Sequence, residues 1–165
     1  MPRSNNVHRD DVAKMSSARK GIFGEQVSDD WMKARKFTSE LSANRQMRLL
    51  EQQPTGRGID GVYRNNEPPP PYVITETKFR TGGNFSPSQL PMTKGSGKQM
   101  SDGWIGPRLD DAVGEEKASM IDTAGYERWL MVVDESGEVT SITKLDENAA
   151  ALLDADGKPA TVSVK

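Results

Sequence analysis

Apolar residues near the start of the chain repeat at helical spacing. They recur at intervals of four, four and three residues and are Phe23, Val27, Trp31 and Ala34. This spacing predicts an amphipathic helix over about residues 21–37, and a second helical pattern covers residues 42–52. Residues 1–18 are polar and aperiodic, so we expect a leader or linker from a larger toxin there, followed by one domain over residues 19–165.

The pattern then changes to that of β-strands. Residues 59–64 and 72–79 are rich in aromatic and β-branched residues, and two asparagines, a glutamate and four prolines separate them. These segments predict two paired strands with an extended connection. Residues 81–98 are rich in glycine, serine and proline and predict a long loop, a feature that often carries function.

The second half of the chain predicts two helices and two further strands. The segments are helices over residues 98–109 and 112–123, strands over residues 128–133 and 139–145, and a weak helix, a turn and a short strand within residues 146–165. We expect Pro107 to break or kink the first of these helices, because proline has no backbone N–H to donate. The order of elements predicts an α/β fold, with a small mixed β-sheet flanked by helices.

Composition limits the chemistry that this chain can perform. Its 165 residues include no cysteine and one histidine, which excludes disulfides, thiolate metal sites, histidine-based zinc sites and Ser-His triads. No apolar run approaches the ~18 residues of a membrane span, so we expect no membrane insertion. Catalysis would have to use carboxylates, lysine, hydroxyls or a hard metal ion.

Charge is distributed unevenly between the two halves of the chain. Residues 1–81 carry 14 basic and 10 acidic side chains, whereas residues 82–165 carry 8 basic and 14 acidic ones, for a net charge of −2. An isoelectric point near 5.5 argues against a simple basic nucleic-acid-binding domain. It still allows a basic cleft, because electrostatic steering depends on the local field.

A carboxylate and a lysine lie two residues apart in the strand predicted over residues 72–79. Because side chains alternate across a strand, Glu76 and Lys78 share one face, and pairing with the preceding strand would bring Asp60 near Glu76. The two carboxylates and the Thr77 carbonyl would suit Mg²⁺, and Lys78 could orient a water or stabilise charge on phosphorus. The plainer alternative is a cross-strand ion pair on a solvated face, worth about 0–1 kcal/mol.

Two more polar residues extend this pattern into one that resembles a known family. Glu25 follows a glycine in the first predicted helix, Asp60 lies in the stretch Gly-Ile-Asp-Gly, and Gln99 follows the Glu-Thr-Lys strand at a predicted helix start. In this order they resemble the PD-(D/E)XK nuclease superfamily, in its restriction-endonuclease-like toxin branch. Residues 18–115 are similar to C-terminal toxin domains of bacterial polymorphic toxins, such as contact-dependent inhibition proteins, Rhs proteins and type VI secretion effectors.

The resemblance implies a restriction-endonuclease-like core and a role for each matching residue. The implied ligands of Mg²⁺ or Mn²⁺ are Asp60, Glu76, Thr77 through its carbonyl, and Glu25; the implied catalytic lysine is Lys78; and Gln99 is implied to lie near the scissile phosphate. The chain departs from the family pattern in two places. The strand that the family places before the aspartate is not evident in residues 38–57, and Ile59 stands where a proline often precedes the aspartate.

The resemblance also implies a biological setting. The domain would be secreted or delivered as part of a larger effector, act as a monomer in the cytoplasm of a competing bacterium, and be inhibited by a cognate immunity protein. DNA is the favoured substrate because hydrolysis by water needs no 2′-hydroxyl, and cleavage of RNA, especially tRNA, is the alternative. A third interpretation, of another class, is a non-enzymatic interaction domain in which Asp60, Glu76 and Lys78 form a surface ion network.

Overall fold

The structure is a computed structural model that describes residues 9–45 and 58–165. Its helices are α1 (Arg9–Ala13), α2 (Ser17–Ala34), α3 (Asp102–Val113) and α4 (Glu115–Ala124), with short 3₁₀ helices η2 (Ala43–Arg45) and η3 (Pro87–Gln89). Its strands are β1 (Thr38–Ser39), β2 (Gly61–Arg64), β3 (Tyr72–Phe79), β4 (Met92–Thr93), β5 (Gly97–Lys98), β6 (Tyr126–Val133) and β7 (Val139–Leu145). No helix in these ranges is long and apolar enough to cross a membrane.

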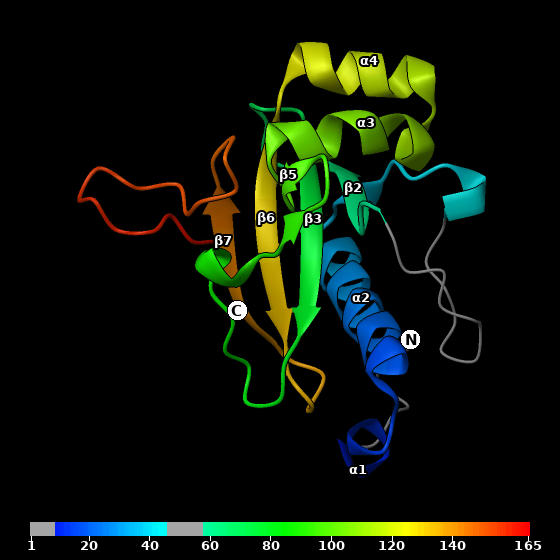
Figure 1. Cartoon of the computed structure of the whole chain (residues 1–165), viewed down its shortest axis with the longest axis vertical. Helices are drawn as coiled ribbons and strands as arrows, with labels where there is room; N and C mark the ends of the chain where they lie inside the picture. Colours follow the sequence, from blue (N-terminus) through cyan, green and yellow to red (C-terminus); the bar gives the residue numbers. More distant parts are fainter. Residues whose placement is uncertain (1–8, 46–57) are drawn as a thin grey trace.

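Five strands form one mixed sheet in the order β1–β2–β3–β6–β7, and β4 pairs with β5 in a separate ribbon. The neighbours in the large sheet are antiparallel except for β3 and β6, which are parallel. A parallel pair needs a crossover connection, and the segment between these strands contains α3 and α4, drawn at the top of Figure 1. The predicted α/β fold with a small mixed sheet flanked by helices is therefore confirmed.

Alternating side chains of the central strands build two apolar clusters on opposite faces of the sheet. Ile74 of β3 and Leu130 of β6 pack in the cluster that contains the buried residues of α3 and α4. Val73 and Met131, their neighbours along the strands, pack in the cluster that contains the buried residues of α2. The sheet thus separates α2 from the α3–α4 pair, and a residue's place in β3 decides which helices it faces.

The first helix and the central strands follow the sequence predictions closely. Helix α2 begins earlier than expected, because the Ser16 side chain caps it by accepting a hydrogen bond from the Arg19 amide at 3.2 Å. The segment predicted as a leader contains α1, in which Val12 is fully buried. The second predicted helix is wrong over residues 42–45, where only the 3₁₀ turn η2 forms, and its remainder, residues 46–52, lies outside the described residues.

Three predictions for the second half need correction. Pro107 lies inside α3 without ending it, because burial of Ile105 and Leu109 on either side outweighs one lost hydrogen bond. The loop predicted over residues 81–98 contains η3 and the β4–β5 ribbon. No helix forms after residue 145, since the Asp146 carboxylate accepts hydrogen bonds from the amides of residues 148 and 150 and folds the chain into a turn.

The end of the chain forms irregular structure against β7. The predicted turn at Asp156-Gly157 is confirmed, with Gly157 at φ +78° and its amide donating to the Asp154 carbonyl at 3.0 Å. The predicted final strand is reduced to isolated bridges, one of which joins Thr143 to Thr161.

Gly61, the first residue of β2, has no room for a side chain. A Cβ there would lie 2.3 Å from Thr75 Oγ1 and 2.7 Å from the Tyr63 ring. We predict that Gly61→Ala lowers the free energy of unfolding, measured in urea, by about 1–3 kcal/mol. Gly21→Ala is the control, because nothing lies within 4 Å of its Cβ position, and it should raise stability by about 0.5–1 kcal/mol. Equal stability of the two variants would contradict the packing described.

Candidate functional site

The candidate site lies where β2 begins and leaves one edge of β3 open. The β2–β3 pairing starts with Gly61 opposite Thr75, so the backbone of Thr77 lies beyond the last pair. Asp60 occupies this opening, and its Oδ2 accepts a hydrogen bond from the Thr77 amide at 2.9 Å. In an extended strand the N–H and C=O of one residue face the same edge, so the Thr77 carbonyl is directed to the same opening.

Glu76 and Lys78 lie on the face of β3 that is turned toward α3 and α4, as Ile74 does. The Lys78 ammonium is 3.3 Å from Glu76 Oε2, and the two side chains are 18% and 5% exposed. The other carboxylate oxygen, Glu76 Oε1, is buried and has no hydrogen-bond partner in the structure. An ion pair on a solvated face would not bury its carboxylate or leave an oxygen without a donor. The solvated-face alternative therefore does not describe this pair.

Glu25 comes from the opposite face of the sheet. It is one helical turn before Asp29, whose buried carboxylate accepts a hydrogen bond from the Tyr63 hydroxyl of β2 at 2.7 Å. Residues four apart share one side of a helix, so Glu25 also faces β2, at the end where that strand has not yet begun. There the Glu25 side chain interacts with Asp60 and lowers the pKa of the Asp60 carboxyl. Glu25 of helix α2 and Glu76 of strand β3 thus approach Asp60 from opposite faces of the sheet.

The electrostatics of the site follow from its burial. Burial raises the pKa of Glu76 well above its usual value, the negative charge of Asp60 raises it further, and Lys78 opposes the rise. Burial also raises the pKa of Asp60, with the Thr77 amide as the first opposing influence, followed by Glu76, Lys78 and Glu25. Because the Asp60 and Glu76 carboxyls lie close together and are poorly solvated, the pair favours a bound proton or a cation between them.

Arg45 fixes the backbone just before Asp60. Its Nη2 donates to the Ile59 carbonyl at 2.9 Å, and its Nε lies 3.1 Å from Asp111 of α3. Gly58 adopts φ +118°, and a Cβ there would lie 3.0 Å from Arg45 Nη2. Arg45 carries no signal in the sequence, because it falls within a predicted helix and no local pattern marks a residue that contacts a segment 14 positions away.

Gln99 is not at a helix start, which corrects the prediction for this residue. Met100 adopts φ +73° and Ser101 is extended, so α3 begins only at Asp102. The Gln99 Oε1 atom is buried without a hydrogen-bond partner. No hydrogen bond or ion pair among the described residues joins it to Asp60, Glu76 or Lys78.

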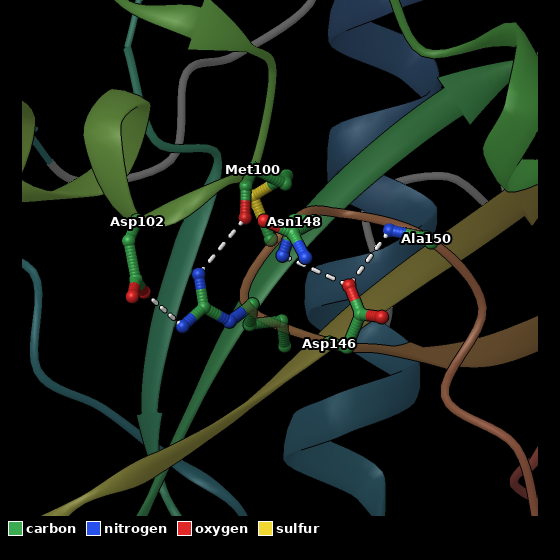
Figure 2. A network of polar contacts seen from close by, with 6 residues as sticks. Met100, Asp102, Asp146, Asn148 and Ala150 are labelled. Atoms are coloured by element: carbon green, nitrogen blue, oxygen red, sulfur yellow. Dashed lines mark hydrogen bonds and ion pairs between the residues drawn. The ribbon is translucent and has the colours of Figure 1, made fainter.

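The segment around Gln99 is held by a polar network (Figure 2). Arg128 of β6 donates to the Met100 carbonyl at 3.1 Å and pairs with the Asp102 carboxylate. The turn that Asp146 organises lies beside them in Figure 2 and is bonded to the same segment, since Lys98 Nζ donates to the Ala149 carbonyl at 2.8 Å. These contacts fix the backbone of residues 98–102 and account for the position of Gln99.

The site offers few side-chain ligands to a metal ion. Within residues 9–45 and 58–165, no group of three or more His, Cys, Asp or Glu side chains could hold a metal ion by such ligands alone. A divalent cation would depend on Asp60, Glu76 and the Thr77 carbonyl, with water as the remaining ligands. Mg²⁺ commonly keeps several waters and one or two carboxylates, and Glu76 Oε1 is a buried acceptor without a donor. The donor chemistry therefore fits a hard cation.

Comparison with known proteins does not assign the chain to a family. No family model matches the chain, and neither does any curated protein or solved structure.

The raised pKa of Glu76 predicts how the free energy of unfolding changes with pH. Because the native pKa exceeds the unfolded value, burial of the charged form destabilises the fold above the native pKa, and this effect disappears as the pH falls toward 4.5. In EDTA, Glu76→Gln should therefore be more stable than the wild type at neutral pH, and the difference should shrink on acidification. Urea unfolding at a series of pH values measures this, and a variant less stable than the wild type at neutral pH would contradict it.

Proposed function

We propose that this chain is a metal-dependent nuclease that hydrolyses phosphodiester bonds. The observation that carries the proposal is the meeting of Asp60, Glu76 and Lys78 at the open edge of β3, with a buried Glu76 oxygen that has no donor. The sequence resemblance to PD-(D/E)XK nucleases supports the same roles for these residues. We also propose that the mixed sheet is a restriction-endonuclease-like core, in which β1 is the short strand not evident from residues 38–57.

Each residue has a distinct part in the proposed reaction. Asp60 and Glu76 would hold a divalent cation, Mg²⁺ or Mn²⁺, and the bound ion would supply Lewis-acid chemistry to the phosphate and to the attacking water. The Lys78 ammonium, 3.3 Å from Glu76, lies where it can stabilise negative charge on the phosphate oxygens. The water would attack phosphorus and release one of its protons to solvent, the bond from phosphorus to the leaving oxygen would break, and that oxygen would take up a proton from solvent. Glu25 orients the site through its interaction with Asp60.

The proposed substrate is DNA, and the proposed setting is competition between bacteria. Hydrolysis by an activated water requires no 2′-hydroxyl on the substrate, so the substrate need not be RNA. As the toxin domain of a larger effector, it would act as a monomer in the target-cell cytoplasm and need a cognate immunity protein in the producing cell. The alternative is cleavage of tRNA by the same residues, and parallel assays on plasmid DNA and tRNA distinguish the two.

We predict that the purified protein nicks or linearises plasmid DNA in Mg²⁺ or Mn²⁺ and that EDTA abolishes cleavage. Lys78→Ala should lower the rate about 100-fold, because it removes a charge that stabilises the transition state. Gel assays on plasmid and on total tRNA, run in parallel, measure the rate on each substrate.

Lys144→Ala is the matched control, since Lys144 also pairs with a glutamate of the same sheet, Glu127, at 3.2 Å. It should keep the wild-type rate within about twofold. If Lys78→Ala and Lys144→Ala behave alike in a folded protein, the pair Glu76–Lys78 is structural and the nuclease proposal fails. Undiminished cleavage in EDTA would remove the metal from the mechanism.

Substitution of a carboxylate should lower the cleavage rate more when that carboxylate would bind the cation directly. We predict that Asp60→Asn and Glu76→Gln each lower the rate about 1,000-fold or more, whereas Glu25→Gln lowers it about 10- to 100-fold because it acts through Asp60. The double variant of Asp60 and Glu76 should lose little more than either single one, since both serve the same cation. Single-turnover rates with circular dichroism as a folding check give this ranking, and additive losses would argue against a shared cation.

A further inference from the structure

One aromatic ring lies beside two cations at the end of β3. The Lys78 ammonium is 5.9 Å from the centroid of the Phe85 ring, and the Arg80 guanidinium carbon is 4.7 Å from it. Residues 78 and 80 lie on the same side of an extended chain, so the ring faces both. Lys78 is mostly buried against Glu76, whereas Arg80 is exposed. The two cations therefore differ in what they can reach.

The chain holds Phe85 firmly in place on both sides. Before it, the Gly83 carbonyl accepts a hydrogen bond from Thr140 Oγ1 of β7 at 2.9 Å, and Gly83, at φ +72°, has no room for a Cβ beside Thr140. After it, Ser86 and Gln89 form a capping box around η3. The ring itself packs against the apolar cluster of α3 and α4. The segment predicted as a long loop is thus an ordered support at this position.

We infer that Phe85 is a positioning residue that separates the roles of these two cations: it holds Lys78 at Glu76 and presents Arg80 to a neighbouring phosphate of a nucleic-acid backbone. A cation on an aromatic face loses little of its charge to the ring and is restricted in orientation. Arg80 is further oriented by its own hydrogen bond to the Phe79 carbonyl at 2.7 Å. Arginine's planar fork suits phosphate, which accepts several hydrogen bonds from it.

This inference deepens the proposed function and rests on it for the identity of the ligand, but its test does not require cleavage. Binding of a labelled DNA duplex and of a labelled tRNA is measured by fluorescence anisotropy in EDTA, at several salt concentrations. Arg80→Gln should weaken binding about tenfold and reduce the slope of log affinity against log salt by about one, as expected for one lost phosphate contact. Phe85→Leu should also weaken binding, although it removes no charge, and Phe85→Tyr should restore it.

Arg108→Gln is the matched control. The Arg108 guanidinium carbon is also 4.7 Å from a ring centroid, that of Trp104, and Arg108 also donates to a backbone carbonyl, at 2.9 Å. It lies on α3, at the top of Figure 1, whereas Arg80 directly follows the end of β3 at the bottom, so its removal should leave the salt slope unchanged. Arg80 is exposed, so Arg80→Gln should fold even if Phe85→Leu does not.

The outcomes separate the inference from the proposed function. A wild type that binds nucleic acid without cleaving it, with the variants ranked as above, supports the inference while the nuclease proposal fails. Equal effects of Arg80→Gln and Arg108→Gln overturn the inference, whether or not the protein cleaves. A wild type that binds neither DNA nor tRNA overturns it as well. If the protein cleaves, Arg80→Gln should raise KM about tenfold with kcat within twofold, whereas Phe85→Leu should also lower kcat.

Discussion

The burial of the Glu76 carboxylate beside an open sheet edge is the constraint on which the rest of the site depends. Glu76 is 4% exposed, and one of its oxygens has no donor. Burial of an ionised carboxylate without full pairing costs free energy, so proteins keep such groups where they have a use. The opening exists because β2 begins at Gly61, one residue after Asp60, and Gly61 itself fits only without a side chain. A longer β2 would pair with Thr77 and close the site.

The surrounding structure holds each acid by a different element. Asp60 is fixed by the Thr77 amide and, one residue earlier, by Arg45, which also reaches Asp111 of α3. Glu25 is placed by α2, which approaches β3 closely because Gly24 lies against Thr77 and Phe79. Strands and helices far apart in the sequence therefore converge on one point. These hydrogen bonds and buried contacts leave little freedom for the side chains to rearrange when a ligand binds.

The parts of the fold that could be predicted from the sequence are those with a strong local pattern. Strand β3 was predicted with its observed bounds, and β7 likewise, because apolar residues bounded by turn residues mark them clearly. The placement of Asp60, Glu76 and Lys78 together followed from strand alternation and pairing. Arg45 and Phe85 could not be found in this way, since their roles depend on contacts across the fold. The predicted break at Pro107 does not occur, because tertiary burial of α3 outweighs a local rule.

The proposed sharing of a divalent cation by Asp60 and Glu76 is tested most directly by locating the ion. Crystals of the wild-type protein soaked in Mn²⁺ would be measured for anomalous scattering. We expect a peak about 2.1 Å from Glu76 Oε1 and from an Asp60 carboxylate oxygen, and no peak there in Glu76→Gln. A wild-type protein with no peak at this position, or with manganese bound only elsewhere, would contradict the claim.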